Sequence, residues 1–484
     1  MTDANEICRM DAVTLAAKIR SRELSAIEVT VAALARMEKL EPILQAFCTP
    51  TPDLAIDQAR RIEAEIAAGR DPGPVAGVPA SIKDLILTKG IRTASGSAAY
   101  ENFVPDEDDV AVERLKAAGA IILGKTNVPE FGYSATGHNP IFETTRNPWN
   151  TTLTSGGSSA GAAVAVATGM GPLAVGSDGG GSVRIPASFC GLYGFKPSFG
   201  RIPLYPGARD ERYPGVSGWE SLECYGPLTR TVADAALMTS VMAGPDMRDR
   251  HSLPPANFDW IEALKGDLKG KRIAYSRDWG YAAVEPEVLR IADAAVKVFE
   301  RDLGCIVEQA NPGWDDPARA FAGVVVAETD LAGMRTMLDR YESRMSPHLV
   351  DLLRMPWTAE DFTNANVGRK ALVNKMWRFM MRYDLLLTPT LAVPPFPILM
   401  QGPDKIAGQV ARASSWLCFT FPINLTGQPA ATVPAGFTSD ALPVGLQIIG
   451  RHLDDPMVLR ASACFEAARP WRDKWPPLLD KMRL

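Results

Sequence analysis

Residues 150–200 constrain the fold of this chain more than any other segment, because they combine a high density of glycine, serine and alanine with an apolar setting. A flexible linker of this composition would carry charge or repetition, and this segment has neither. Small residues at this density let stretches of backbone approach one another closely. We therefore predict a tightly packed site here, with residues 160–176 forming a buried helix.

Strand-like and helical patterns alternate along the rest of the chain, which indicates an α/β fold. Residues 1–70 are predicted to be a helical segment, in which Ser25 and Glu28 form the capping box of one helix. No linker or internal repeat divides the remainder, so residues 71–484 are expected to form one large domain with the N-terminal segment packed on it. Strand-like stretches occupy residues 73–87, 120–123, 272–276, 305–310, 384–387 and 444–449, and helical stretches occupy residues 108–118, 287–303 and 316–382.

Composition excludes several classes of protein. The net charge of −5 gives no basic surface for nucleic acid or an anionic membrane. Seven cysteines without a CxxC pair and four histidines without zinc-ligand spacing predict a reducing compartment and no metal site. A secretory signal and an apolar run of membrane-spanning length are both missing from the sequence, so we expect a cytoplasmic protein.

One segment matches a known phosphate-binding motif but lies between the wrong secondary-structure elements for that function. Residues 119–126 (GAIILGKT) match the phosphate-binding pattern GxxxxGK[ST] letter for letter. Such a loop must follow a strand and open a helix, so that its backbone N–H groups surround the phosphates. Here a helix precedes the motif, its apolar centre predicts a strand, and Pro129 follows soon after. We therefore predict that this segment does not bind a nucleotide.

Lys83 is the candidate catalytic base. It lies in the apolar stretch VPASIKDLIL (residues 78–87), where a surface lysine is not expected. A lysine accepts a proton only when it is neutral, so burial must lower its pKa from about 10.4. The alternative is a strand-end lysine paired with Asp84.

Two Gly/Ser runs, residues 154–161 and 176–186, supply candidate nucleophiles. Flexible loops are the alternative for both runs. Asp178 and Arg184 flank Ser182 and are candidates for orienting its loop.

Three segments resemble the signatures of the amidase signature family: GVPASIKD (residues 77–84), GGSSAG (156–161) and GSDGGGSVRIPASFCG (176–191). The resemblance runs from about residue 10 to about residue 470, and the spacing of these segments matches the Ser–Ser–Lys triad of that family. It implies one α/β domain in which helices cover both faces of a central mixed sheet.

The resemblance also implies a role for each site residue. Ser182 would form the acyl-enzyme, Lys83 would be the base, and Ser158, held on a cis peptide bond after Gly157, would relay protons between them. No metal or organic cofactor is implied. The oxyanion hole would be made by backbone N–H groups, which belong to Gly179, Gly180, Gly181 and Ser182.

The expected function is hydrolysis of the C–N bond of a small-molecule amide, with no nucleic-acid or membrane partner. Carbamates (urethanes) and esters are within reach of the same tetrahedral chemistry. Gly179 stands where the family commonly has a bulkier residue, which bears on substrate range. Five aromatic residues are candidates for an apolar cleft, with ordinary packing as the alternative: Tyr205, Tyr213, Trp219, Trp357 and Trp377.

Two further points stay open from the sequence. The first is an alternative function, the amidase subunit of a glutamyl-tRNA(Gln) or aspartyl-tRNA(Asn) amidotransferase, which needs a partner chain. The second is the oligomeric state, for which a homodimer would be unsurprising, since two-fold dimers are the commonest oligomers.

Overall fold

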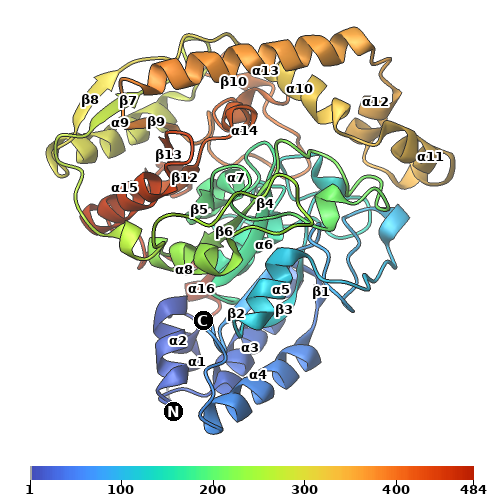
Figure 1. The fold of residues 1–484 in the computed structure, drawn as a ribbon, viewed down its shortest axis with the longest axis vertical. Helices are drawn as coiled ribbons and strands as arrows, with labels where there is room; N and C mark the ends of the chain where they lie inside the picture. The colour runs from blue at the N-terminus through green and yellow to red at the C-terminus, as the bar shows by residue number, and fades with distance from the viewer. Residues whose placement is uncertain (1–2) are drawn as a thin grey trace.

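The computed structural model describes residues 3–484, which fold around an eleven-stranded sheet (Figure 1). The strand order is β1-β3-β2-β4-β6-β5-β12-β13-β9-β7-β8. β2 runs parallel to β3 and β4, and β7 runs parallel to β8 and β9, whereas the other neighbours are antiparallel. The predicted α/β class and mixed sheet are therefore confirmed. The strands are β1 (Phe47–Pro50), β2 (Pro79–Lys83), β3 (Ile121–Thr126), β4 (Leu173–Asp178), β5 (Tyr193–Lys196), β6 (Cys224–Thr229), β7 (Arg272–Tyr275), β8 (Ile306–Gln309), β9 (Leu385–Pro389), β12 (Ala430–Phe437) and β13 (Pro443–Gly450), with β10 (Lys405–Ile406) and β11 (Gln409–Val410) as a separate pair.

Helices flank both faces of this sheet. α6 and α7 contact each other and pack on strands from β2 to β13, while α8, α9 and α15 form a second group against the sheet. In α9 the predicted apolar face is buried, because its apolar side chains recur at helical spacing. The helices are α1 (Ala4–Ile7), α2 (Ala12–Arg20), α3 (Ala26–Leu44), α4 (Pro52–Ala67), α5 (Val110–Ala117), α6 (Ala160–Ala167), α7 (Arg184–Cys190), α8 (Val232–Met242), α9 (Pro286–Arg301), α10 (Ala318–Ala327), α11 (Leu331–Tyr341), α12 (Pro347–Arg354), α13 (Ala359–Met380), α14 (Phe421–Thr426), α15 (Asp455–Ala468) and α16 (Pro477–Lys481).

Two local predictions were wrong. The expected helix over residues 160–176 ends at Ala167, and β4 begins at Leu173. Between them Gly169 and Gly171 adopt φ values of 73° and 103°, which lie outside the helical region. The N-terminal 70 residues are also not wholly helical, because β1 pairs antiparallel with β3 at the edge of the sheet. The domain boundary at residue 70 stays a prediction.

The nucleotide-like motif lies in a buried strand, as predicted. Gly124, Lys125 and Thr126 are the last three residues of β3. Lys125 is fully buried, and its Nζ donates hydrogen bonds of 2.7 Å to Ile86 O and to Thr93 Oγ1. Its amine therefore satisfies backbone and side-chain acceptors of the core.

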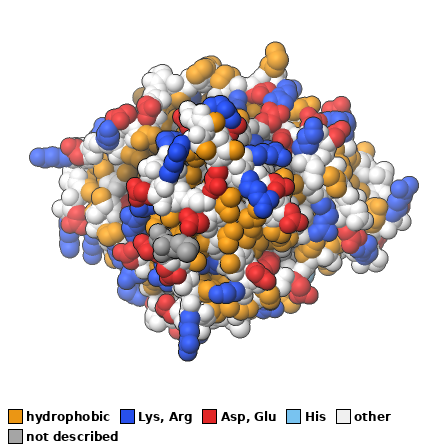
Figure 2. All heavy atoms as spheres, turned by 90° about the horizontal axis from the view of Figure 1, so that it is seen from below, with side chains coloured by type: hydrophobic (Ala, Val, Ile, Leu, Met, Phe, Trp, Pro, Cys, Tyr) orange, Lys and Arg blue, Asp and Glu red, His pale blue; other side chains and the backbone are white. Residues whose placement is uncertain are grey.

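The face that carries the N-terminal helices mixes both signs of charge, and apolar side chains gather near its centre (Figure 2). Val13 and Val31 are among the exposed apolar residues of these helices. Within residues 3–484, every helix is too short or too polar to cross a bilayer.

Candidate active site

Lys83 is the last residue of β2, a strand enclosed by β3 and β4. Its side chain is fully buried. Nζ lies 2.7 Å from Ser158 Oγ and 2.9 Å from Ser177 Oγ, and it donates a third hydrogen bond of 3.2 Å to Ser177 O. The structure thus brings together Lys83 and Ser158, which are far apart in the sequence. Pairing of Lys83 with Asp84 is not formed, because the cation 3.7 Å from Asp84 Oδ1 is Lys125.

Burial lowers the pKa of Lys83 to about 7. The negative charges of Glu223 and Asp178 oppose this effect, because they stabilise the protonated amine. A lysine with this pKa is substantially neutral at physiological pH, which is the form that accepts a proton.

Ser158 lies two residues before the start of α6, and its peptide bond with Gly157 is cis, as the family resemblance implies. Gly157 leaves no room for a side chain, since a Cβ there would lie 2.3 Å from Thr136 O. The neighbouring Ser159 donates its backbone N–H to Ser182 O over 3.3 Å. This bond fixes the two Gly/Ser runs against each other.

The second Gly/Ser run turns sharply between β4 and α7, and Ser182 lies within this turn. The resemblance implied that the N–H of Gly181 helps to form the oxyanion hole. In the structure this N–H instead donates a 2.8 Å hydrogen bond to Asp178 Oδ1, so it is not free to bind an oxyanion. In the part of the chain that the structure describes, no acceptor binds the N–H groups of Gly179, Gly180 or Ser182. These three N–H groups are therefore available to bind an acceptor atom of a ligand.

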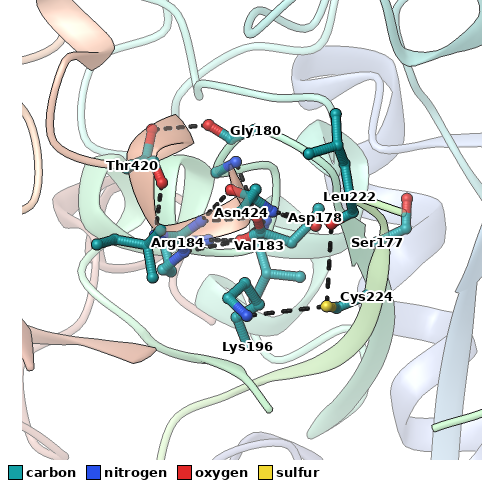
Figure 3. Close-up of polar contacts among 12 residues, drawn as sticks. Ser177, Asp178, Gly180, Val183, Arg184, Lys196, Leu222, Cys224, Thr420 and Asn424 are labelled. Carbon is teal, nitrogen blue, oxygen red and sulfur yellow. Dashed lines mark hydrogen bonds and ion pairs between the residues drawn. The ribbon is translucent and has the colours of Figure 1, made fainter. Parts of the chain in front are cut away.

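Asp178 and Arg184 form a buried ion pair beneath this turn (Figure 3). Arg184 contacts the carboxylate through Nη2 at 2.8 Å and through Nε at 2.9 Å. Burial alone would raise the pKa of Asp178, but the charge and hydrogen bonds of Arg184 lower it to about 2. The carboxylate also accepts hydrogen bonds from the loop N–H groups, so the pair holds the turn in shape.

The predicted supporting residues are joined by polar side chains from the C-terminal third of the chain. Asn424 of α14 donates to Asp178 Oδ1 over 2.9 Å and accepts from Arg184. Thr420 Oγ1 donates to Gly180 O over 2.7 Å (Figure 3). Gln447 of β13 also accepts from Arg184. The sequence analysis assigned none of these three residues to the site, although Gln447 ends a segment, LPVGLQ (residues 442–447), that resembles the family.

A cavity of about 20 Å³ lies beside both serines, which is room for about one water molecule. The relay hydrogen bond between Ser158 and Ser182 is not formed within the described residues of this conformation, and active-site bonds often shorten only when substrate binds. Of the five candidate aromatic residues only Trp219 lines the cavity. The lining residues are Leu85, Phe131, Gly132, Ser158, Ser177, Gly179, Ser182, Ala208, Val216, Trp219, Glu223 and Tyr225.

No group of three or more histidine, cysteine or acidic side chains that could hold a metal ion occurs between residues 3 and 484. The arrangement is suited to acyl transfer, since serine hydroxyls and the unpaired N–H groups of Gly179 and Ser182 line one cavity, next to a lysine of lowered pKa.

The sequence matches the Amidase family over residues 28–459. An acylamidase from Rhodococcus erythropolis is 40% identical over 98% of both chains. A glutamyl-tRNA(Gln) amidotransferase chain from Carboxydothermus hydrogenoformans is 35% identical, covering 95% of this chain and 97% of that one. Among solved structures, a bacterial aryl acylamidase of the amidase signature family superimposes with a TM-score of 0.89 at 31% identity, covering 97% and 98% of the two chains. A 6-aminohexanoate cyclic dimer hydrolase bound to substrate gives a TM-score of 0.83 at 28% identity, covering 98% and 99%.

Proposed function

Because the chain belongs to the amidase signature family and is an amidohydrolase acting on carbon–nitrogen bonds other than peptide bonds, we propose that its acyl-enzyme forms on Ser182 and that Lys83 drives the reaction through Ser158. The observation that carries this proposal is the 2.7 Å contact between Ser158 Oγ and a buried Lys83 amine whose pKa is about 7.

The proposed reaction begins with neutral Lys83. Its Nζ takes the proton of Ser158 while Ser158 takes the proton of Ser182, and Ser182 Oγ bonds to the carbonyl carbon of the amide. The resulting oxyanion accepts hydrogen bonds from the free N–H groups of the glycine turn. Ser158 then gives a proton to the leaving amine as the C–N bond breaks, and Lys83 returns its proton to Ser158. Water hydrolyses the acyl-enzyme through the same relay.

The proposed substrates are small amides with a planar apolar group. Trp219 and Phe131 in the cavity lining support this class, as do the names of the acylamidase and aryl acylamidase relatives. Aryl carbamates (urethanes) and esters pass through the same tetrahedral intermediate and are included.

The seven cysteines are all free thiols, which supports a cytoplasmic location. A homodimer stays part of the proposal, to be tested by the solution mass.

The test is hydrolysis of an anilide, an aliphatic amide, an aryl carbamate, a p-nitrophenyl ester and glutamine by the purified chain. We expect turnover of the anilide or carbamate, and a fall in kcat of at least about 10⁴-fold in both Ser182→Ala and Lys83→Ala. Exposed Ser439→Ala and Lys89→Ala are the matched controls and retain activity. Turnover that survives in Ser182→Ala would contradict the nucleophile. Activity that requires a partner chain and glutamine would favour the amidotransferase reading, the function named for relatives at 35% identity.

A further inference from the structure

The indole ring of Trp219 rests directly on Gly179, the first residue after β4. A Cβ placed on Gly179 would lie 2.5 Å from Trp219 Cε3 and 3.2 Å from Cζ3. The φ of Gly179 is not in the positive range that would demand glycine. Glycine is therefore required here for space, and the group that occupies this space is the Trp219 ring.

The backbone of Trp219 is held in an unusual conformation. Its φ is +58°, a region that bulky side chains rarely adopt. Such outliers persist where the surrounding structure enforces them, and they concentrate at ligand sites. The ring makes edge-to-face contacts with Tyr133 at 5.1 Å and with Phe321 at 6.0 Å between ring centroids. These two aromatic contacts help to hold the ring in place.

The indole also carries a polar group whose hydrogen bonding is incomplete. Trp219 Nε1 is buried and makes no hydrogen bond of good geometry with the described residues, and the hydroxyl of Tyr133 is its polar neighbour. Buried indole N–H groups usually find an acceptor. Trp219 lines the same cavity as Ser158 and Ser182, and this cavity of about 20 Å³ is too small for an amide with an aromatic ring. Binding of such a substrate therefore requires movement of the cavity lining.

We propose that Trp219, seated on Gly179, determines the specificity of this enzyme for amides that carry a planar aromatic ring. The substrate ring packs against the indole, and a polar substrate atom accepts a hydrogen bond from Nε1. Gly179 contributes by leaving the space in which the indole lies beside the nucleophile. This inference rests on the proposed function, because it assigns the substrate class of the same site.

The experiment compares acetanilide, benzamide and an N-alkyl acetamide of similar size as substrates of the purified enzyme. Trp219→Leu removes the aromatic face and keeps apolar bulk, Trp219→Phe keeps a ring and removes the N–H, and Gly179→Ala pushes the indole away. We expect Trp219→Leu to lower kcat/KM for acetanilide or benzamide by about tenfold or more, mainly through KM, with the alkyl amide changed less than about threefold. The ratio of aryl to alkyl kcat/KM should also fall in Gly179→Ala. In Trp219→Phe it should fall by a smaller factor than in Trp219→Leu.

Trp357→Leu serves as the control, because that indole stacks on Phe362 and does not line the cavity. The burst of p-nitrophenol from p-nitrophenyl acetate counts folded active sites in each variant. An equal fall for aryl and alkyl amides, or an unchanged ratio in both Trp219 variants, overturns the proposal. Calorimetric binding of acetanilide and the alkyl amide to Ser182→Ala, with and without Trp219→Leu, tests the ring contact without turnover. This arm therefore separates a failure of the specificity role from a failure of the nucleophile assignment.

Discussion

Lys83 combines two opposing influences at a single amine. Burial at the end of β2 favours the neutral form, whereas Glu223 and Asp178 favour the protonated form. The balance leaves its pKa at about 7, while two serines hold Nζ in place. Glu223 lines the cavity, and burial raises the pKa of its own carboxyl against the effect of Lys83. The charge state of this one carboxyl therefore bears on the base.

The pH dependence of activity follows from this balance. In the proposed mechanism the neutral amine of Lys83 is the reactive form, so kcat/KM should rise about tenfold per pH unit below pH 7 and level off at about pH 8. Glu223→Gln removes a negative charge that raises the pKa of Lys83, so the midpoint should move to lower pH. Glu220→Gln, three residues earlier and outside the cavity lining, should leave the midpoint in place. Steady-state kinetics on the ester from pH 5 to 10 measure this, and identical midpoints in wild type and Glu223→Gln would refute it.

A second prediction concerns the buried ion pair under the glycine turn. Arg184→Met leaves the Asp178 carboxylate buried without its cation, which costs about 3–5 kcal/mol in the free energy of unfolding. The turn should also lose its shape, so kcat falls as well. Arg248→Met removes a partly exposed ion pair with Glu113 and should cost less than about 1 kcal/mol. Urea denaturation compares the two, and equal losses would show that the Asp178 pair does not stabilise the fold.

At the scale of helices and strands, the sequence predicted an element correctly where a single local pattern, such as a capping box or apolar residues at helical spacing, determined it. The capping box of α3 and the apolar face of α9 are both present. The structure also brings Lys83 within 2.7 Å of Ser158, which lines one cavity with Ser182, while the catalytic roles of these residues stay a prediction. What failed depended on contacts distant in sequence, such as β1 joining the sheet edge. Asn424 could not be predicted for the same reason, because only the folded chain brings α14 under the glycine turn.

The helix α6 shows why the Gly/Ser/Ala segment requires small side chains. Every residue of α6 is buried, and a Cβ on Gly161 would lie 2.0 Å from Ala46 O and 2.6 Å from Asn127 N. A backbone atom cannot rotate away as a side chain can. The glycine therefore allows the helix that follows Ser158 to approach two neighbouring segments of the chain.

Gly161→Ala should consequently destabilise the protein by about 1–3 kcal/mol or more, even though alanine favours helix formation. The control is Gly368→Ala in α13, where the nearest atom is the Cβ of Ala320 at 3.1 Å. That substitution should change stability by less than about 1 kcal/mol, because the helix-propensity gain offsets a tight contact. Thermal and urea unfolding provide the comparison. A Gly161→Ala protein as stable as wild type would contradict the close approach.

At the scale of the whole molecule, two large apolar clusters occupy the N-terminal and C-terminal parts of the sheet. The site lies between them, since Lys83 comes from β2 while Asn424 and Gln447 come from the C-terminal third. The central strands therefore carry residues of the candidate site and also form part of the hydrophobic core. Arg9 donates a 3.0 Å hydrogen bond to Leu484 O, so the segment after α1 lies beside the C-terminal residue, at the opposite side from α13 (Figure 1).

Arg230, just after β6, ties the C-terminal segment to the core. Its Nη2 donates hydrogen bonds of 2.8 Å to Arg472 O and to Lys474 O, and its guanidinium lies 3.6 Å from the centre of the Trp475 ring. Burial lowers the pKa of Arg230 to about 9. Carbonyl oxygens and an aromatic ring thus take the place of water around the guanidinium. A neutral side chain cannot make the same set of contacts.

Arg230→Met should therefore reduce the free energy of unfolding by about 2–3 kcal/mol, because two carbonyl groups and a cation–π contact lose their partner. The kcat on the ester should stay within about twofold of wild type, since Arg230 lies about 17 Å along β6 from the cavity residue Tyr225. Lys474→Met is the matched control: it keeps the carbonyl that Arg230 binds and alters only an exposed side chain. Urea denaturation with parallel activity assays distinguishes the two effects. A large loss of kcat at unchanged stability would mean that the C-terminal segment acts on the site directly.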